Sequence, residues 1–293
     1  MEHIKQHDAC PVCESTHLDK HLQVKDWMIT LESFTIQKCN SCGFHFTNPI
    51  PAENSIGSYY KSEEYVSHSS TNKGLVNKLY NLIRNLTLNH KVSLIRSYTK
   101  GNSVLDIGSG TGHFLNACVK EGLIVQGLEP DVDARNFAKE HFDLDLMELD
   151  TLEAIETNSK DVITMWHVLE HVYHLKRDVA EIVRVLKDNG TLFIAVPNMD
   201  SYDAKVYKEY WAAYDVPRHL YHFQENTIKQ LFSQFGLECV KIVPMKFDAY
   251  YVSMLSEKYK GGNIVKAFFN GLLSNFKSES HGYSSQIYVF QKK

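Results

Sequence analysis

From residue 103 onward, short apolar runs alternate with segments whose apolar residues recur at helical spacing. The runs are SVLDIG, IVQGLEP, DLMEL, DVITMW and TLFIAVP; the helical segments are HFLNACVKEG, DVDARNFAKEHF, LKRDVAEIVRVLKDNG and TIKQLFSQFG. Such alternation predicts a parallel, doubly wound sheet that helices cover on both faces. LECVKIVPM and the final SSQIYVFQKK predict two further strands. We therefore expect an α/β fold built on one large sheet.

The first hundred residues follow other patterns. Residues 1–50 are dense in Cys and His and predict a small module in which two turns are joined by short strands. Residues 51–100 form a polar linker and then a helical segment, which we expect to cover a cleft. Residues 101–293 form the large domain, with a helical insertion at 246–282. Three linker tyrosines are expected to fold over the cleft or to pack the module against the large domain: Tyr59, Tyr60 and Tyr65.

Composition and charge narrow the classes of partner. The chain has 293 residues and a net charge of -4 with histidine neutral, so no broad attraction to nucleic acid or to an anionic membrane is expected. The N-terminus MEHIKQHDACPVCES is polar, and no apolar run is long enough to span a membrane. We expect a soluble, cytoplasmic protein. The sequence does not predict its oligomeric state.

Four of the six cysteines form two C-x-x-C pairs near the N-terminus: Cys10, Cys13, Cys39 and Cys42. Four thiolates suit tetrahedral Zn²⁺, and a structural site uses all four positions for protein ligands. The alternative is a pair of redox-active dithiols, which needs a thioredoxin-like setting that the sequence does not show. We predict a zinc-ribbon-like module.

The stretch SVLDIGSGTGHF, residues 103–114, places glycines between a strand and a helix. A glycine-rich first turn lets the backbone approach a ligand closely, although any tight strand-to-helix turn can use glycine without a ligand. A dinucleotide fingerprint is G-x-G-x-x-G, whereas here His113 takes the third place. Asp106 is unfavourable beside phosphates but suits a ligand with an ammonium group. S-adenosylmethionine has an ammonium group, a cationic sulfonium and no phosphate, so the loop favours that cofactor.

The segment VLDIGSGTG resembles the first motif of class I S-adenosylmethionine-dependent methyltransferases, which implies a Rossmann-like, doubly wound mixed sheet. By this resemblance Asp106, Gly108 and Gly110 hold the methionine part of the cofactor. Glu129, in GLEP, accepts both ribose hydroxyls, and Asp150 or the next residue contacts adenine. The complete set of expected cofactor contacts is Asp106, Gly108, Ser109, Gly110, Gly112, Glu129, Pro130, Asp150, Thr151 and His167.

The segment TMWHVLEHV, after the fourth strand, carries three polar side chains that helical spacing would place on one face of a following helix: His167, Glu170 and His171. It is similar to a segment of ubiquinone-biosynthesis O-methyltransferases, in which an E-x-x-E-H trio is linked to a divalent metal. Here histidine replaces the first acid. We favour a reading in which Glu170 and His171 form hydrogen bonds and His167 lines the cofactor pocket, over a catalytic metal.

The segment WAAYDVPRHLYHFQENTI resembles a D-x-P-R-H-x-x-H-F segment that follows the fifth strand in a subgroup of these enzymes. His222 is a candidate general base, and Arg218 a candidate clamp for a substrate phosphate or carboxylate. The alternative is that Arg218 pairs with Asp215 while both histidines pack. The candidates for the reaction centre are His222, His219, Arg218 and His167.

These features predict a methyltransferase with a small-molecule substrate. A zinc knuckle followed by TNPIP and a tyrosine pair also resembles sugar C-methyltransferases, which suggests a sugar or cell-envelope precursor as the acceptor. Two alternatives stay open. One is a nucleic-acid or protein methyltransferase that uses the zinc module as a reader, and the other is a non-catalytic module that binds the cofactor.

Overall fold

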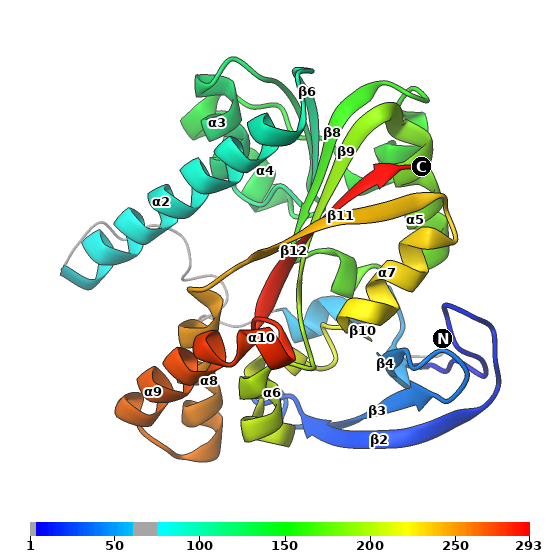
Figure 1. Cartoon of the computed structure of the whole chain (residues 1–293), viewed down its shortest axis with the longest axis vertical. Helices are drawn as coiled ribbons and strands as arrows, with labels where there is room; N and C mark the ends of the chain where they lie inside the picture. Colours follow the sequence, from blue (N-terminus) through cyan, green and yellow to red (C-terminus); the bar gives the residue numbers. More distant parts are fainter. Residues whose placement is uncertain (1–3, 61–74) are drawn as a thin grey trace.

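The computed structural model describes residues 4–60 and 75–293. Its centre is a six-stranded sheet in the order β11-β12-β9-β8-β6-β7 (Figure 1). The strands are β6 (Ser103–Ile107), β7 (Ile124–Leu128), β8 (Lys160–Trp166), β9 (Leu186–Pro197), β11 (Leu237–Pro244) and β12 (Ser285–Lys292). The first four are parallel, and β12 runs antiparallel between β9 and β11. The predicted doubly wound mixed sheet is therefore confirmed.

Helices cover both faces of this sheet. They are α2 (Leu75–Tyr98), α3 (His113–Lys120), α4 (Val132–Phe142), α5 (Leu175–Val185) and α7 (Glu225–Ser233). Successive residues of a strand point to opposite faces of the sheet, so the core is divided into one cluster on each face. Val289 joins the cluster under α2 and α3, whereas the adjacent Tyr288 and Phe290 join the cluster under α5 and α7.

Three segments differ from the sequence-based expectation. DLMEL is not a strand: it forms one bridge, Leu128 with Met147, before a short 3-10 helix, η2 (Leu149–Ala154). The helix expected through residue 190 ends at Val185, because the chain at once joins the sheet as β9. The third segment, after β8, forms only a three-residue 3-10 turn, η3 (Leu169–His171), and the next α-helix begins at Leu175.

The N-terminal module forms its own antiparallel sheet, and a strand from the large domain completes it. The order is β10-β4-β3-β2, with β2 (Leu18–Lys25), β3 (Ser33–Cys39), β4 (His45–Thr47) and β10 (Tyr221–His222). A separate pair joins β1 (Ile4–Lys5) to β5 (Ile50–Pro51). Phe44 of the module packs against Tyr221 and Phe223, so the two parts share one core. The module therefore pairs and packs directly with the segment that contains the D-x-P-R-H motif.

Helices fill the interval between β11 and β12: α8 (Asp248–Lys260), α9 (Ile264–Phe276) and α10 (Ser278–His281). They pack beside α6 (Tyr202–Tyr207) and the 3-10 turns η4 (Lys208–Tyr210) and η5 (Ala212–Tyr214), at the lower left of Figure 1. In the part of the chain that the structure describes, no helix is both long and apolar enough to cross a bilayer. The linker contributes the short 3-10 helix η1 (Ile56–Tyr59), and Tyr65 lies outside the described residues.

Candidate active site

The glycine loop connects β6 to α3 and adopts a backbone conformation that favours glycine. Gly108, Gly110 and Gly112 have φ angles of 73, 51 and 77°. A Cβ atom on Gly108 would lie 2.4 Å from Cγ2 of Val168, so the loop also packs too closely for a side chain. The backbone N–H groups of residues 108 and 109 donate to the carbonyl of Leu128 and hold the loop against β7. The glycines are therefore required by left-handed backbone and by close packing.

Asp106 occupies the carboxyl end of β6, directly before this loop. Its carboxylate is 1% exposed and accepts a 2.5 Å hydrogen bond from the Thr164 hydroxyl of β8. Burial raises the pKa of Asp106 to about 7, against the opposing effect of Thr164. The side chain of Ser109 turns inward and donates to the backbone carbonyl of Asp106. A cationic ligand group placed here would stabilise the charged carboxylate.

Lys91 of α2 reaches the same region. Its ammonium lies 4.1 Å from the centroid of the Trp166 ring. Burial lowers the pKa of Lys91 to about 8, although Asp106 and Asp248 oppose the shift. The sequence analysis missed this residue. The sequence did carry a signal for Lys91. This lysine stands beside Val92 in the stripe of α2 that packs on the sheet, and burial of an unpaired charge there is costly.

Glu129 follows β7 and is 8% exposed. Its carboxylate accepts hydrogen bonds from the backbone N–H groups of Gly110, at 2.7 Å, and Asp131, at 3.0 Å. Burial raises the pKa of Glu129, and these two hydrogen bonds oppose the shift. The carboxylate therefore ties the glycine loop to the end of the neighbouring strand and retains further acceptor capacity.

A cavity of about 490 Å³ opens at this edge of the sheet. Ile107, Pro130, Asp150 and Met165 line it, and it extends to His171. This is the edge beyond the carboxyl ends of β6 and β8, where the strand order reverses and where doubly wound folds bind ligands. Thr151 instead donates its hydroxyl hydrogen to the backbone carbonyl of Glu148. Asp150 is thus the better placed of the two predicted adenine contacts.

His167 has a left-handed backbone, with φ of 59°. Its Nδ1 lies 3.3 Å from Glu170 Oε1, and its Nε2 lies 3.1 Å from Asp248 Oδ2 of α8. Burial lowers the pKa of His167, but the two carboxylates outweigh it and raise the pKa to about 9. The imidazole is therefore protonated at neutral pH and joins the loop after β8 to the helical insertion. The contact with Asp248 was not expected from the sequence.

Arg218 forms a buried network in place of an open anion clamp. Its guanidinium is 1% exposed and donates to both carboxylate oxygens of Asp215, to Asp26 Oδ1 and to the backbone carbonyl of Tyr59. Burial lowers the pKa of Arg218, but the two carboxylates outweigh it and the net shift is upward. Each of the three guanidinium nitrogens already donates to a protein acceptor, whereas the expected substrate clamp needs donors that are free for a ligand. The pairing with Asp215, left open above, is the arrangement present.

His222 lies on the strand that completes the sheet of the N-terminal module. It is 4% exposed, and its Nε2 lies 3.0 Å from the Thr47 hydroxyl. Burial holds the pKa of His222 well below its usual range. The ring packs against Tyr214 and does not line the 490 Å³ cavity, so this histidine joins two structural layers.

His219 lies beside His171 and Glu170, in what we call the histidine cluster (Glu170, His171 and His219). The two imidazole rings meet edge to face with centroids 4.6 Å apart. The Tyr60 hydroxyl lies 3.1 Å from His171 Nδ1, so the linker reaches this cluster. Because Glu170 and His171 come from η3 and His219 comes from the segment after η5, the cluster exists only in the folded chain.

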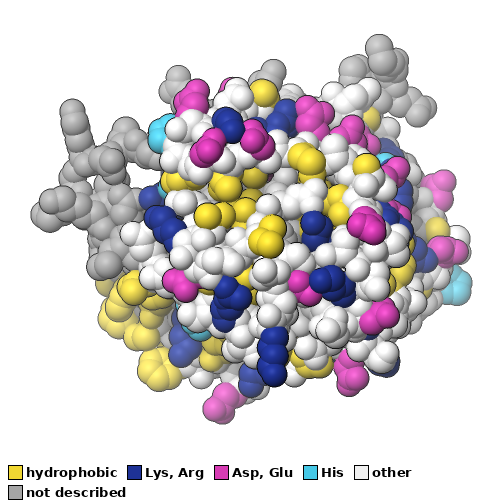
Figure 2. Space-filling model, turned by 90° about the horizontal axis from the view of Figure 1, so that it is seen from above, with side chains coloured by type: hydrophobic (Ala, Val, Ile, Leu, Met, Phe, Trp, Pro, Cys, Tyr) yellow, Lys and Arg dark blue, Asp and Glu magenta, His cyan; other side chains and the backbone are white. Residues whose placement is uncertain are grey.

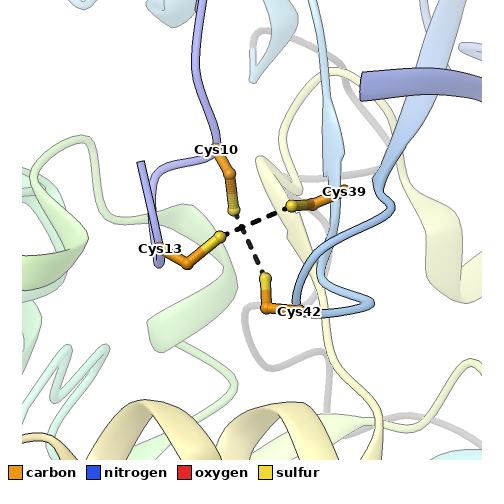
Figure 3. A group of neighbouring side chains, drawn as sticks. All are labelled: Cys10, Cys13, Cys39 and Cys42. Carbon is orange, nitrogen blue, oxygen red and sulfur yellow. Dashed lines mark hydrogen bonds between the residues drawn. The ribbon is translucent and has the colours of Figure 1, made fainter. Parts of the chain in front are cut away.

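The four cysteines of the two C-x-x-C pairs converge in the N-terminal module (Figure 3). Cys10 Sγ lies 3.6 Å from Cys42 Sγ, and Cys13 Sγ lies 3.5 Å from Cys39 Sγ. Four sulfurs at about 2.3 Å from a tetrahedral Zn²⁺ would be about 3.8 Å apart, so this donor set fits the ion.

A family model described as a methyltransferase domain matches residues 81–242, more than half of the chain. The chain belongs to this family. It is 34% identical over 108 residues to the mitochondrial ubiquinone biosynthesis O-methyltransferase of Candida albicans, covering 33% of each protein. It is 31% identical over 105 residues to the ubiquinone biosynthesis O-methyltransferase of Coxiella burnetii, covering 34% of this chain and 45% of that protein. The chain thus spans less than half of the length of these curated relatives.

Two solved structures show the same fold. A SAM-dependent methyltransferase from Archaeoglobus fulgidus is 20% identical, with a TM-score of 0.51, over 71% of this chain and 94% of that one. Magnesium protoporphyrin IX methyltransferase from Synechocystis, solved with bound S-adenosylhomocysteine (SAH), is 13% identical, with a TM-score of 0.54, over 82% of this chain and 100% of that one. At these identities the likeness establishes the architecture alone.

Proposed function

We propose that this chain is an S-adenosylmethionine-dependent methyltransferase that acts on a small molecule. The observation that carries the proposal is the loop of left-handed glycines between Asp106 and Glu129, beside the cavity at the switch point. When bound, the cofactor supplies an electrophilic methyl group on a cationic sulfonium. We assign Asp106 to its ammonium group and Glu129 to its ribose hydroxyls, since each is a buried carboxylate with acceptor capacity.

We assign Lys91 to the carboxylate of the cofactor's methionine part. A buried ammonium needs an anionic partner, and Lys91 lies close enough to Asp106 for their charges to interact. The amino-acid part of S-adenosylmethionine carries both charges, so Asp106 and Lys91 together form a complementary pair of sites. Substitution of Lys91 by Met is expected to weaken binding of SAH by about tenfold and to leave adenosine binding unchanged.

The acceptor is proposed to be a small hydroxylated molecule in the cavity that His171 lines. The relatives named as ubiquinone biosynthesis O-methyltransferases support an oxygen acceptor. In the reaction the acceptor oxygen forms a bond to the methyl carbon as the carbon–sulfur bond breaks. The hydroxyl proton of the acceptor is released to water, and neutral SAH leaves. A sugar or cell-envelope precursor remains a narrower proposal within this class.

Of the predicted candidates for the reaction centre, we retain His219. His167 is protonated at neutral pH and cannot accept a proton, while Arg218 and His222 are buried in structural contacts. His219 lies against His171, which lines the cavity. The acceptor's reacting oxygen is therefore placed near the histidine cluster.

The cysteine cluster is proposed to hold a structural Zn²⁺. Purified protein is expected to contain about one zinc per chain by elemental analysis, and Cys39→Ser is expected to lose it and to unfold the module. Cys239→Ser, which changes a cysteine outside the cluster, is the matched control. If the Cys39→Ser protein kept the stability of wild type, and if removal of zinc did not change that stability, the assignment would be contradicted.

A nucleic-acid substrate finds less support. Acidic and basic side chains are interspersed on the face shown in Figure 2, without a continuous basic stripe of the kind that follows a phosphate backbone. The net charge of -4 agrees with this view.

Titration of zinc-loaded protein with SAH by calorimetry tests the cofactor site. Micromolar binding is expected, and Glu129→Gln should weaken it by about 10- to 100-fold, because the amide carries no charge and can accept only one of the two backbone hydrogen bonds. Asp145→Asn, an exposed substitution, is the control. Absence of binding by folded wild-type protein would overturn the proposed function. Methyl transfer from labelled cofactor to phenolic acceptors and to nucleotide sugars then separates the two acceptor classes.

A further inference from the structure

Helix α9, in the insertion between β11 and β12, has the opposite arrangement to an ordinary surface helix. Such a helix buries its apolar side chains and exposes polar ones. The residues that α9 buries are small: Ala267, Gly271 and Ser274. A Cβ atom on Gly271 would lie 2.9 Å from the Cα atom of Tyr250 in α8, so the two helices pack closely through this side. The large apolar side chains of α9 therefore lie on its other side.

These large side chains form an exposed apolar surface, which we call the α9 surface. Residues four apart lie above one another on a helix, so the members fall into two adjacent rows. Their exposure ranges from 40% for Leu273 to 74% for Phe276. Helix α9 lies at the outer edge of the molecule, beside α8 (Figure 1). A contiguous exposed group of this kind indicates a binding surface. The members are Ile264, Val265, Phe268, Phe269, Leu273 and Phe276.

The exposed charges of the two helices have one sign. Residues 248–277 include four lysines, all exposed, and two acidic residues. Asp248 pairs with His167, and Glu257 is 6% exposed. The side chains of residues 266 and 277, about three helical turns apart, lie on one side of α9, next to that of residue 273. Positive charge therefore borders the α9 surface. The lysines are Lys258, Lys260, Lys266 and Lys277.

We propose that the α9 surface binds the headgroup region of an anionic lipid bilayer. A helix with aromatic and aliphatic side chains on one side and lysines beside them lies in the plane of a bilayer surface. Its apolar side chains enter the boundary between headgroups and acyl chains, and its ammonium groups contact anionic headgroups.

Charge distinguishes the bilayer from a second copy of this chain. In a symmetric dimer the same patch faces itself, so the lysines of both copies would come together around the contact. An anionic bilayer instead supplies the opposite charge. The net charge of -4 gives the whole chain no broad attraction to such a bilayer, so binding depends on this local surface. None of its apolar residues lines the 490 Å³ cavity, so the inference is independent of the proposed function.

Flotation of the full-length, zinc-loaded protein with lipid vesicles tests the proposal. Vesicles of phosphatidylglycerol and phosphatidylcholine should bind at least about tenfold more tightly than vesicles of phosphatidylcholine alone, and added salt should weaken the binding. The double variant Phe268→Ser/Phe269→Ser is expected to weaken binding by at least about tenfold. Ile264→Ser should also weaken it, whereas Ile124→Ser is the matched control, because these isoleucines are 71% and 65% exposed.

Thermal unfolding and SAH binding are measured on the same proteins. Loss of vesicle binding by folded variants that keep the SAH affinity of wild type would support the proposal. No binding of anionic vesicles by wild type, or equal binding by wild type and the double variant, would overturn it. Self-association that the double variant abolishes, without vesicle binding, would assign the surface to a second copy and would also overturn it. If the double variant does not fold, Ile264→Ser decides. SAH binding without vesicle binding would leave the proposed function in place.

Discussion

The glycine loop and the histidine cluster, which we propose as the two ends of one site, are built in different ways. The loop is a single stretch whose left-handed glycines and terminal Asp106 lie within seven residues of the chain. The cluster draws Glu170 and His171 from one turn and His219 from a segment nearly fifty residues later. Local backbone geometry therefore determines the cofactor end, whereas long-range packing determines the acceptor end.

Arg218 is the residue through which the rest of the fold supports the cluster. It joins Asp215, next to the cluster, to Asp26 of the N-terminal module, and its backbone carbonyl orients His171. Damage to this network is expected to disturb the acceptor end first, while the cofactor end depends on its own sheet contacts. The following predictions test this division.

Substitution of Arg218 by Met should produce the largest change. It leaves two buried carboxylates without their partner, so the free energy of unfolding is expected to fall by about 3–5 kcal/mol. Denaturant titration measures the loss, with Arg177→Met as the control, since the exposed pair of Arg177 with Asp178 is worth less than about 1 kcal/mol. SAH affinity in the remaining folded protein should stay within about threefold of wild type. A parallel collapse of SAH binding would mean that the two ends are not separate.

The converse test is Gly108→Ala. The left-handed φ and the overlap with Val168 are expected to displace the loop and to weaken SAH binding by about 100-fold. Gly57→Ala is the control, because that glycine has open space around it and no left-handed φ. Retention of wild-type SAH affinity by Gly108→Ala would refute the role assigned to the loop.

The pH dependence of cofactor binding isolates Asp106. Burial raises its pKa to about 7, and only the ionised carboxylate attracts an ammonium group. SAH affinity is therefore expected to decrease by about tenfold per pH unit below pH 7, and to decrease again above about pH 8, where Lys91 loses its proton. Lys91, whose pKa is about 8, stays protonated below pH 7 and does not contribute to the decrease. Adenosine, which lacks the ammonium group, should bind independently of pH, and a similar decrease for adenosine would exclude Asp106 as the cause.

The smallest effect is expected for His222→Asn. Because His222 contacts Thr47 and lies outside the cavity, the methyl-transfer rate should remain within about threefold of wild type. A general base would contribute about 10²- to 10⁴-fold. A loss of that size, in a variant whose melting temperature is preserved, would return His222 to the reaction centre.

Several features were readable from local pattern. The alternation of apolar runs predicted the sheet, and SVLDIGSGTGHF predicted the strand and the glycine loop that follows it. The paired cysteines predicted a cluster that the fold assembles. Features that depend on distant contacts were missed. The segment DLMEL, expected as a strand, forms a single bridge, and the helix expected from the spacing at His167 is a short 3-10 turn. Lys91 and Asp248 reached the site from helices that carried no motif.

The sequence by itself determined most of the elements, the glycine loop and the donor set of the cysteine cluster, because each is written in short stretches of chain, two of them for the cysteines. Tertiary structure alone decided that Arg218 is a buried ion pair, that His222 joins two layers, and that His219 faces His171 and Glu170. Those outcomes depend on which distant segment supplies the neighbouring atoms. Burial and charge pairing depend on those neighbours, so residue type and spacing did not determine the roles of these side chains.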